Sequence, residues 1–107
     1  MRVNINGIEW AIVFVKPSSS YLKRDDGSIT LGVCDNNVKC IFISNTLRDL
    51  SYERVLIHEL THAWIFSYGI YLTLEQEEFV CEFVSYYGRD IVNVADELIS
   101  HSVYKAI

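Results

Sequence analysis

The segment His58-Glu59-Leu60-Thr61-His62 combines two imidazoles and a carboxylate at a spacing that suits metal chemistry. Residues four apart in a helix lie one turn apart on the same face, so His58 and His62 can reach one metal ion. Glu59 is rotated by about 100° from His58 around the helix axis. It is therefore poorly placed to bind that ion and well placed to act as a general base on a metal-bound water.

Core histidines that happen to be four residues apart are the alternative interpretation of this segment. The residues around the motif are mostly aliphatic or aromatic from Val55 to Phe66, which indicates a helix buried on nearly every face. Burying two imidazoles and a carboxylate in such a helix without a metal ion or polar partners would cost free energy. We therefore favour the metal site, and the expected ion is Zn²⁺.

A zinc centre needs a third protein ligand, and a catalytic one leaves the fourth position to water. The next predicted helix opens with an acidic cluster: Glu75, Glu77, Glu78 and Glu82. A short connection at 70–72 lets this helix return antiparallel and bring one of these carboxylates to the histidines, while the others are solvated charges. The helical wheel leaves Glu77 open as the ligand, because it shares a stripe of small residues with Cys81.

The first half of the chain has the pattern of strands. Asn6-Gly7 is a strong hairpin signal between an N-terminal strand and a largely apolar strand at 8–15. Two β-branched runs, 29–34 and 38–43, are separated by a polar tight turn and predict a second hairpin. The strands of this half are therefore expected to form a twisted, mainly antiparallel sheet.

The second half changes to the period of helices. A helix over 52–68 is expected, with Ser51 as its cap and Gly69 as its stop. Two further helices are expected at about 73–88 and 90–104. Strands followed by helices favour an α+β fold, in which the metal-bearing helix is buried and two more helices complete the domain.

Composition limits the class of protein and its partners. The chain has 107 residues, 50% of them hydrophobic, which predicts one globular domain over 1–107. Nine basic and 14 acidic residues give a formal charge of −5, which disfavours nucleic acid and anionic membranes as partners. The apolar run at 11–15 is far too short to cross a bilayer. The absence of a signal pattern and of Cys-x-x-Cys pairs predicts a cytoplasmic protein.

The motif at 58–62, followed by Glu-Phe-Val-Cys-Glu-Phe-Val at 78–84, resembles the gluzincin zinc metallopeptidases. The whole stretch 29–88 looks like the very small zincin-fold proteins of phages and mobile elements. The resemblance implies a small zincin-like domain that acts in the cytoplasm of a bacterial host and is encoded either by the host or by a phage. It also implies hydrolysis of peptide bonds in a peptide or protein substrate.

The resemblance also implies roles for particular residues. In thermolysin-like gluzincins a glutamate ligand is followed four residues later by an acidic group that orients a histidine. Carried over to this chain, Zn²⁺ is bound by His58, His62 and Glu78, Glu82 accepts a ring N–H, and Glu59 is the catalytic base. Extended substrate pairs with an edge strand in zincins, and the run 38–43 is the expected edge.

Two matters stay open at the level of sequence. The first is a non-enzymatic alternative, in which the chain is a zinc-bound regulatory or interaction module that binds a protein partner and cuts nothing; the intact Glu59 disfavours it. The second is the donor that would stabilise an oxyanion, for which several side chains are candidates and none is preferred: Tyr68, Tyr71, Tyr86, Tyr87 and His101.

Overall fold

The structure is a computed structural model that describes residues 1–105 and the side chains of residues 1–102. Along this part of the chain the strands precede the helices, and the fold class is α+β, as predicted. The elements are β1 (Arg2–Ile5), β2 (Ile8–Val15), the short 3-10 helix η1 (Ser20–Leu22), β3 (Gly32–Asp35), β4 (Cys40–Ser44), α1 (Asp49–Ser67) and α2 (Leu74–Lys105).

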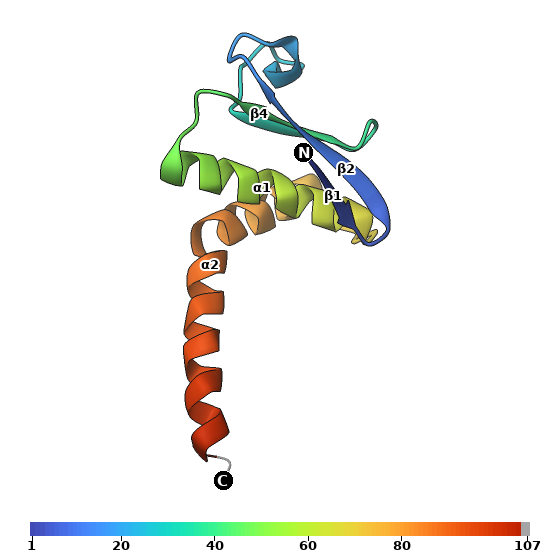
Figure 1. Ribbon diagram of the computed structural model, residues 1–107. Coiled ribbons are helices and arrows are strands. Elements are labelled where there is room, and N and C mark those ends of the chain that lie inside the picture. The colour runs from blue at the N-terminus through green and yellow to red at the C-terminus, as the bar shows by residue number, and fades with distance from the viewer. Residues whose placement is uncertain (106–107) are drawn as a thin grey trace.

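The four strands form a mixed sheet in the order β1-β2-β4-β3 (Figure 1). β1 and β2 pair antiparallel through the predicted turn, where Asn6 and Gly7 both have positive φ values, of 51° and 81°, as this type of hairpin requires. β3 and β4 form the second antiparallel hairpin. The central pairing, between β2 and β4, is parallel. The sheet is therefore antiparallel at two of its three pairings, with a parallel centre that the sequence did not predict.

The predicted edge strand is wrong. The run 38–43 contributes most of β4, which lies between β2 and β3 and has all five residues buried. β1 and β3 are the edges of the sheet. The physical reason is burial. The segment Cys40–Ser44 is the more apolar arm of its hairpin, and an interior position gives it a neighbouring strand at each edge. The other arm, β3, is only partly buried.

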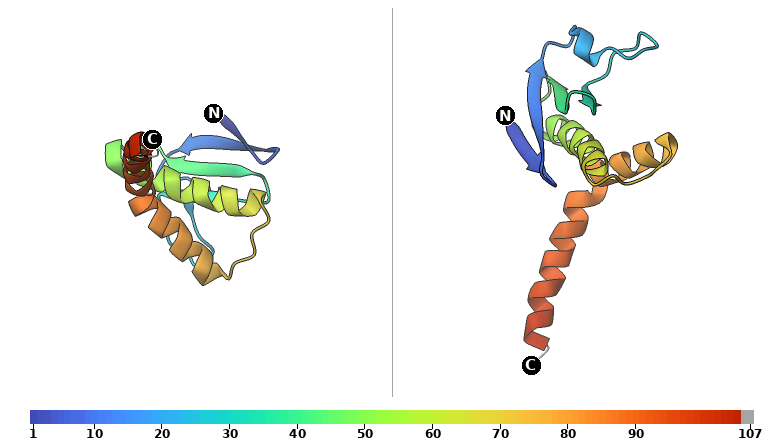
Figure 2. Two further views of the ribbon diagram at one scale, coloured as in Figure 1. Left: turned by 90° about the horizontal axis from the view of Figure 1, so that it is seen from below. Right: turned by 90° about the vertical axis from the view of Figure 1, so that its right-hand side faces the viewer.

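Helix α1 lies across one face of the sheet (Figures 1 and 2). The core between them is aliphatic and aromatic, and its buried members are Ile5, Trp10, Ile12, Ile41, Ile43 and Ala63. The indole Nε1 of Trp10 donates to Ser67 Oγ over 2.8 Å, and the side chain of Asn6 donates to the carbonyl of Ser67 over 3.0 Å. These bonds fix the end of α1 against the N-terminal hairpin.

Two details of α1 differ from the prediction. The helix begins at Asp49, so Ser51 lies inside its first turn, where its hydroxyl accepts the N–H of Arg48 and donates to the carbonyl of Arg48. The helix is also not buried all round, since Trp64 is 48% exposed. Among the described residues, the sheet and α2 make the main contacts with α1, which leaves part of its apolar surface open.

One helix, α2, replaces the two that were predicted at 73–88 and 90–104. Gly88 does not end it, because a glycine inside a helix costs only about 1 kcal/mol relative to alanine. The first part of α2, over 74–88, lies along α1, and the second part, over 89–105, projects away from the body (Figure 2). The molecule with its projecting helix measures 58 × 30 × 27 Å. Within residues 1–105, no helix combines the length and the hydropathy that a membrane span requires.

Candidate metal centre

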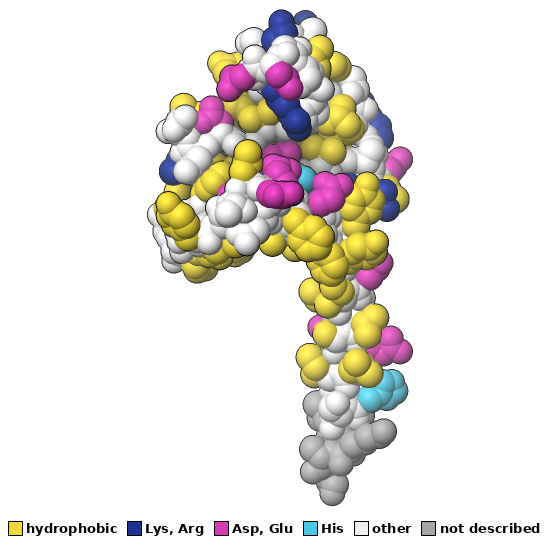
Figure 3. All heavy atoms as spheres, turned by 180° about the vertical axis from the view of Figure 1, so that it is seen from behind, with side chains coloured by type: hydrophobic (Ala, Val, Ile, Leu, Met, Phe, Trp, Pro, Cys, Tyr) yellow, Lys and Arg dark blue, Asp and Glu magenta, His cyan; other side chains and the backbone are white. Residues whose placement is uncertain are grey.

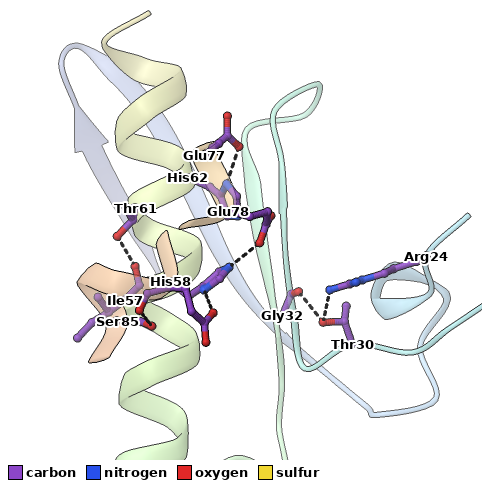
Figure 4. Close-up of polar contacts among 11 residues, drawn as sticks. Arg24, Thr30, Gly32, Ile57, His58, Thr61, His62, Glu77, Glu78 and Ser85 are labelled. Carbon is purple, nitrogen blue, oxygen red and sulfur yellow. Dashed lines mark hydrogen bonds and ion pairs between the residues drawn. The ribbon is translucent and has the colours of Figure 1, made fainter. Parts of the chain in front are cut away.

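The two histidines of the motif lie on the face of α1 that meets the first part of α2 (Figure 4). Their rings are one helical turn apart, with centroids 5.1 Å from each other. His62 is buried and His58 is partly buried. Their placement follows from the sequence, because residues at i and i+4 of a helix share a face.

Glu78 of α2 faces both histidines with a single carboxylate. Its Oε1 atom lies 3.1 Å from Nε2 of His62, and its Oε2 atom lies 3.4 Å from Nε2 of His58. Ligand atoms at 2.0–2.1 Å from a tetrahedral zinc ion lie about 3.3 Å from one another. The spacing of these nitrogens and oxygens therefore suits a shared Zn²⁺, and Glu78 stands where the resemblance placed the third ligand.

The remaining ring nitrogen of each histidine contacts a carboxylate. His58 Nδ1 lies 3.2 Å from Glu82 Oε2, and His62 Nδ1 lies 2.6 Å from Glu77 Oε2. With a metal ion at Nε2, a carboxylate at Nδ1 would hold the ring proton there and leave the Nε2 lone pair for the ion. Glu82 thus lies where a histidine-orienting group was expected, and Glu77 occupies the equivalent position at the second histidine.

A buried thiol, that of Cys81, also reaches this cluster. His58, His62 and Cys81 each offer one ligand atom within 4.8 Å of the others, and this group could hold a metal ion. Burial and the surrounding glutamates raise the pKa of the Cys81 thiol to about 12. Cys81 was not predicted as a ligand; the available signal was its place one helical turn after Glu77.

The fourth glutamate of the acidic cluster stays apart. Glu75 lies in the first turn of α2 and is exposed, without an ion pair in the described structure. The position favours a negative charge because the helix N-terminus is positive. Of the four candidate carboxylates, the fold therefore brings Glu77, Glu78 and Glu82 to the histidines.

Glu59 points toward the sheet side of the cluster and is buried, with 8% of its surface exposed. Burial raises the pKa of its carboxyl to about 7, with Glu78 adding to the rise and His62 opposing it. A carboxyl with a pKa near neutrality can both accept and return a proton at pH 7. The environment therefore suits the role of general base that the motif predicts.

The edge strand β3 passes directly beside Glu59 at Gly32. A Cβ atom on Gly32 would lie 2.7 Å from Cγ1 of Val55 and 3.1 Å from Oε2 of Glu59. Only glycine allows the strand and the helix to approach this closely. The unpaired edge of the sheet and the candidate base are thus neighbours.

Two clefts open at the cluster, and both are lined by β3 together with His58, Glu59 and Glu78. One extends past Arg54 and Tyr86, and the other extends along β3 toward α2. Figure 3 shows acidic side chains gathered around a histidine in a hollow of the surface, with a basic side chain reaching toward them from the opposite wall.

A cationic side chain that was not predicted from the sequence, Arg24, lines both clefts. A tight turn holds it, in which the N–H of Arg24 donates to the carbonyl of Ser28 and the N–H of Gly27 donates to the carbonyl of Arg24. Its guanidinium lies 3.5 Å from the hydroxyl of Thr30 and makes no ion pair with the described carboxylates (Figure 4). Most of its donors therefore remain available in the cleft.

Of the oxyanion donors considered from the sequence, the structure places Tyr86 in a cleft wall, where the guanidinium of Arg54 lies 4.5 Å from its ring centroid. Tyr68, Tyr71 and Tyr87 line neither of the two clefts among the described residues. His101 lies on the projecting part of α2, which extends away from the cluster (Figure 1).

Together the helices supply two histidines, three histidine-contacting carboxylates, a buried thiol and a buried base, and the sheet supplies an open edge beside them. Comparison with protein-family models, with curated proteins and with solved structures finds no match for this chain.

Proposed function

We propose that this protein is a zinc-dependent metallopeptidase built on a minimal zincin-like domain. One observation carries the proposal: the carboxylate of Glu78 lies within 3.4 Å of Nε2 on both His58 and His62, while their Nδ1 atoms contact other carboxylates. An arrangement of this kind costs free energy without a cation, because three carboxylates gather around two histidines and one of them, Glu77, is largely buried.

His58, His62 and Glu78 would hold the zinc ion, with Glu82 and Glu77 orienting the imidazoles. Three protein ligands leave one coordination position open, which is typical of catalytic rather than structural zinc. When bound, Zn²⁺ acidifies a water molecule and polarises a carbonyl group. Glu78 is preferred over Cys81 as the third ligand because its oxygens lie 3.1 and 3.4 Å from the two Nε2 atoms, near the spacing of ligand atoms around zinc.

The residues of this chain then divide the work of peptide hydrolysis. Glu59 takes a proton from the attacking water as its oxygen bonds to the carbonyl carbon, and passes the proton to the leaving amine as the C–N bond breaks. The guanidinium of Arg24 donates to the carbonyl oxygen as that atom gains negative charge. Both groups line the same clefts.

The unpaired edge of β3 is the proposed seat for an extended peptide, in place of the run 38–43. A peptide that adds as a strand along β3 obtains main-chain hydrogen bonds from the edge. It would pass Gly32, where the backbone lies against Glu59. The edge strand thus brings a peptide bond to the base.

A zinc-bound module that cuts nothing remains a second candidate, and Cys81 is the observation in its favour. If both Glu78 and Cys81 bind the ion with the two histidines, all four positions of a tetrahedral zinc are occupied by protein. Such a closed site stabilises a fold or an interface for a protein partner and leaves no position for water.

Cleavage of an unbiased peptide mixture by the zinc-loaded protein separates the two candidates. The peptidase should produce new termini detected by mass spectrometry, and Glu59→Gln should remove them while keeping the metal. Zinc retained by both proteins with no cleavage by the native one would favour the closed module instead.

A further inference from the structure

The projecting part of α2 presents an apolar surface that is largely exposed to solvent. Its large aliphatic side chains are all 53–60% exposed: Ile91, Val92, Val94, Leu98 and Ile99. The last residues of α2 that share a cavity with the body are Arg89, Val92 and Asn93. An isolated helical segment of this length is marginal in water, and an amphipathic one is normally stabilised by packing of its apolar face.

The apolar residues form one broad face. With 3.6 residues per turn, they fall into two adjacent stripes that together span about 160° of the helix. One stripe consists of Tyr87, Ile91, Val94 and Leu98. The other alternates small and large residues: Gly88, Val92, Ala95 and Ile99. Charged and amide side chains occupy the opposite side.

We propose that this face binds the same face of a second copy of the chain, with the two helices antiparallel. The alternating stripe is self-complementary in that orientation. When Gly88 faces Ile99 of the partner subunit, Ala95 faces Val92 of the partner subunit, and the two-fold axis repeats both pairs. Large side chains thus fill the space left by small ones along the contact, which is how close-packed interfaces avoid voids.

Charges beside the stripe favour the same orientation. Arg89 and Asp96 lie on one flank, about 20° apart around the helix. In the antiparallel pair the two flanks meet, so Arg89 lies near Asp96 of the partner subunit at two symmetric places. Arg89 also forms an ion pair with Glu53 of its own chain through Nε, which leaves the other guanidinium nitrogens for the partner.

The apolar side chains available to this contact are large and more than half exposed, from Ile91 at 53% to Leu98 and Ile99 at 60%. An apolar groove on the body, lined by Ile57, Leu60, Trp64 and Val84, continues this surface at Gly88. The second copy would therefore meet a continuous apolar surface along α2 and onto the body.

Sedimentation equilibrium of the full chain across micromolar to submillimolar concentrations tests the proposal, and it does not depend on any enzymatic activity. The native protein should fit a monomer–dimer equilibrium. Ile99→Asp places a charge in the contact and should abolish the dimer, whereas Ser100→Asp places the same charge on the polar side and should leave it intact. Circular dichroism should show equal helix content for the two variants.

Two charge reversals at solvent-facing positions test the antiparallel orientation of the helices without placing a charge inside the apolar contact. Asp96→Lys opposes Arg89 of the partner subunit and should raise the dimer dissociation constant by roughly tenfold, because two pairs change from attraction to repulsion. Asp90→Lys lies on the far side of the helix and should change it by less than twofold. A native protein that is monomeric at every concentration would overturn the proposal. So would a dimer that Ile99→Asp leaves intact, or one that Asp90→Lys weakens and Asp96→Lys does not.

Discussion

The two parts of α2 differ in what their side chains meet. Where the helix lies against α1, the carboxylates of Glu77, Glu78 and Glu82 contact histidines; Glu77 is largely buried, and the other two are about half exposed. Where the helix projects, aliphatic side chains such as Ile91 and Leu98 are more than half exposed to solvent. Crowded carboxylates and exposed apolar groups both cost free energy in the isolated chain.

On the two proposals, each part of α2 is completed by something that the chain alone does not supply. A cation would offset the repulsion among the carboxylates of the first part, and a second apolar face would offset the exposure of the other. The two parts should therefore respond differently to substitution: metal binding should depend on residues of the first part and be independent of the second.

The largest expected effect is loss of zinc from the histidine variants. His58→Ala combined with His62→Ala removes both nitrogen ligands, so elemental analysis should find no stoichiometric zinc. The melting temperature should fall as well, because metal binding is coupled to folding. Ile99→Asp in the projecting part is the matched control and should keep its zinc. A double histidine variant that retains a full equivalent of zinc would exclude this centre.

Next in size is the effect of Glu59→Gln on catalysis. The substitution keeps the size of the side chain and removes the proton acceptor, so peptidase activity should fall by about 10²- to 10⁴-fold. Zinc content should not change, since Glu59 is not among the proposed ligands. Parallel measurement of kcat/KM and bound zinc checks both statements, and metal loss from this variant would mean that Glu59 is a ligand.

The carboxylates of the first part should form a graded series in zinc affinity. Glu78→Ala should cause the greatest loss, because it removes a ligand. Glu82→Ala and Glu77→Ala should each lower the affinity by about 10- to 100-fold, since they release an oriented imidazole. The exposed Glu75→Ala should be silent. Competition titrations with a chromogenic chelator measure the order, and a silent Glu78→Ala would transfer the ligand role to another residue.

The smallest expected effect is that of Gly32→Ala on stability. A Cβ atom at this position meets Val55 at 2.7 Å, so the strand or the helix must shift, at about 1–3 kcal/mol. Urea unfolding should show that loss, and peptide cleavage should fall because β3 no longer lies flat against Glu59. Gly7→Ala is an informative comparison: there the cost arises from a positive φ of 81° in the exposed β1–β2 turn, with no atom within 4 Å of the added Cβ, so cleavage should persist.

Local features of the fold were predictable from the sequence, because they depend on residues close together in the chain. The turn at Asn6-Gly7 follows from their tolerance of positive φ, and the shared face of His58 and His62 follows from helical geometry. The α+β class follows from the change of period midway along the chain.

Features that depend on distant segments were not predictable in the same way. The interior position of β4 results from competition between strands for burial, which a single strand's pattern does not reveal. Gly88 resembles a helix stop in isolation, yet the flanking residues keep the helix continuous. Arg24 and Cys81 join the centre only because a loop and a second helix pack beside α1.

X-ray absorption at the zinc K-edge, measured on purified protein, tests the central claim most directly, because it reports the metal and its ligand atoms together. The proposed centre of His58, His62 and Glu78 predicts a shell of nitrogen and oxygen atoms only, at about 2.0–2.1 Å from the ion. A sulfur neighbour at about 2.3 Å would instead place Cys81 on the metal and contradict the proposed ligand set. Protein that takes up no zinc at all would contradict the centre itself.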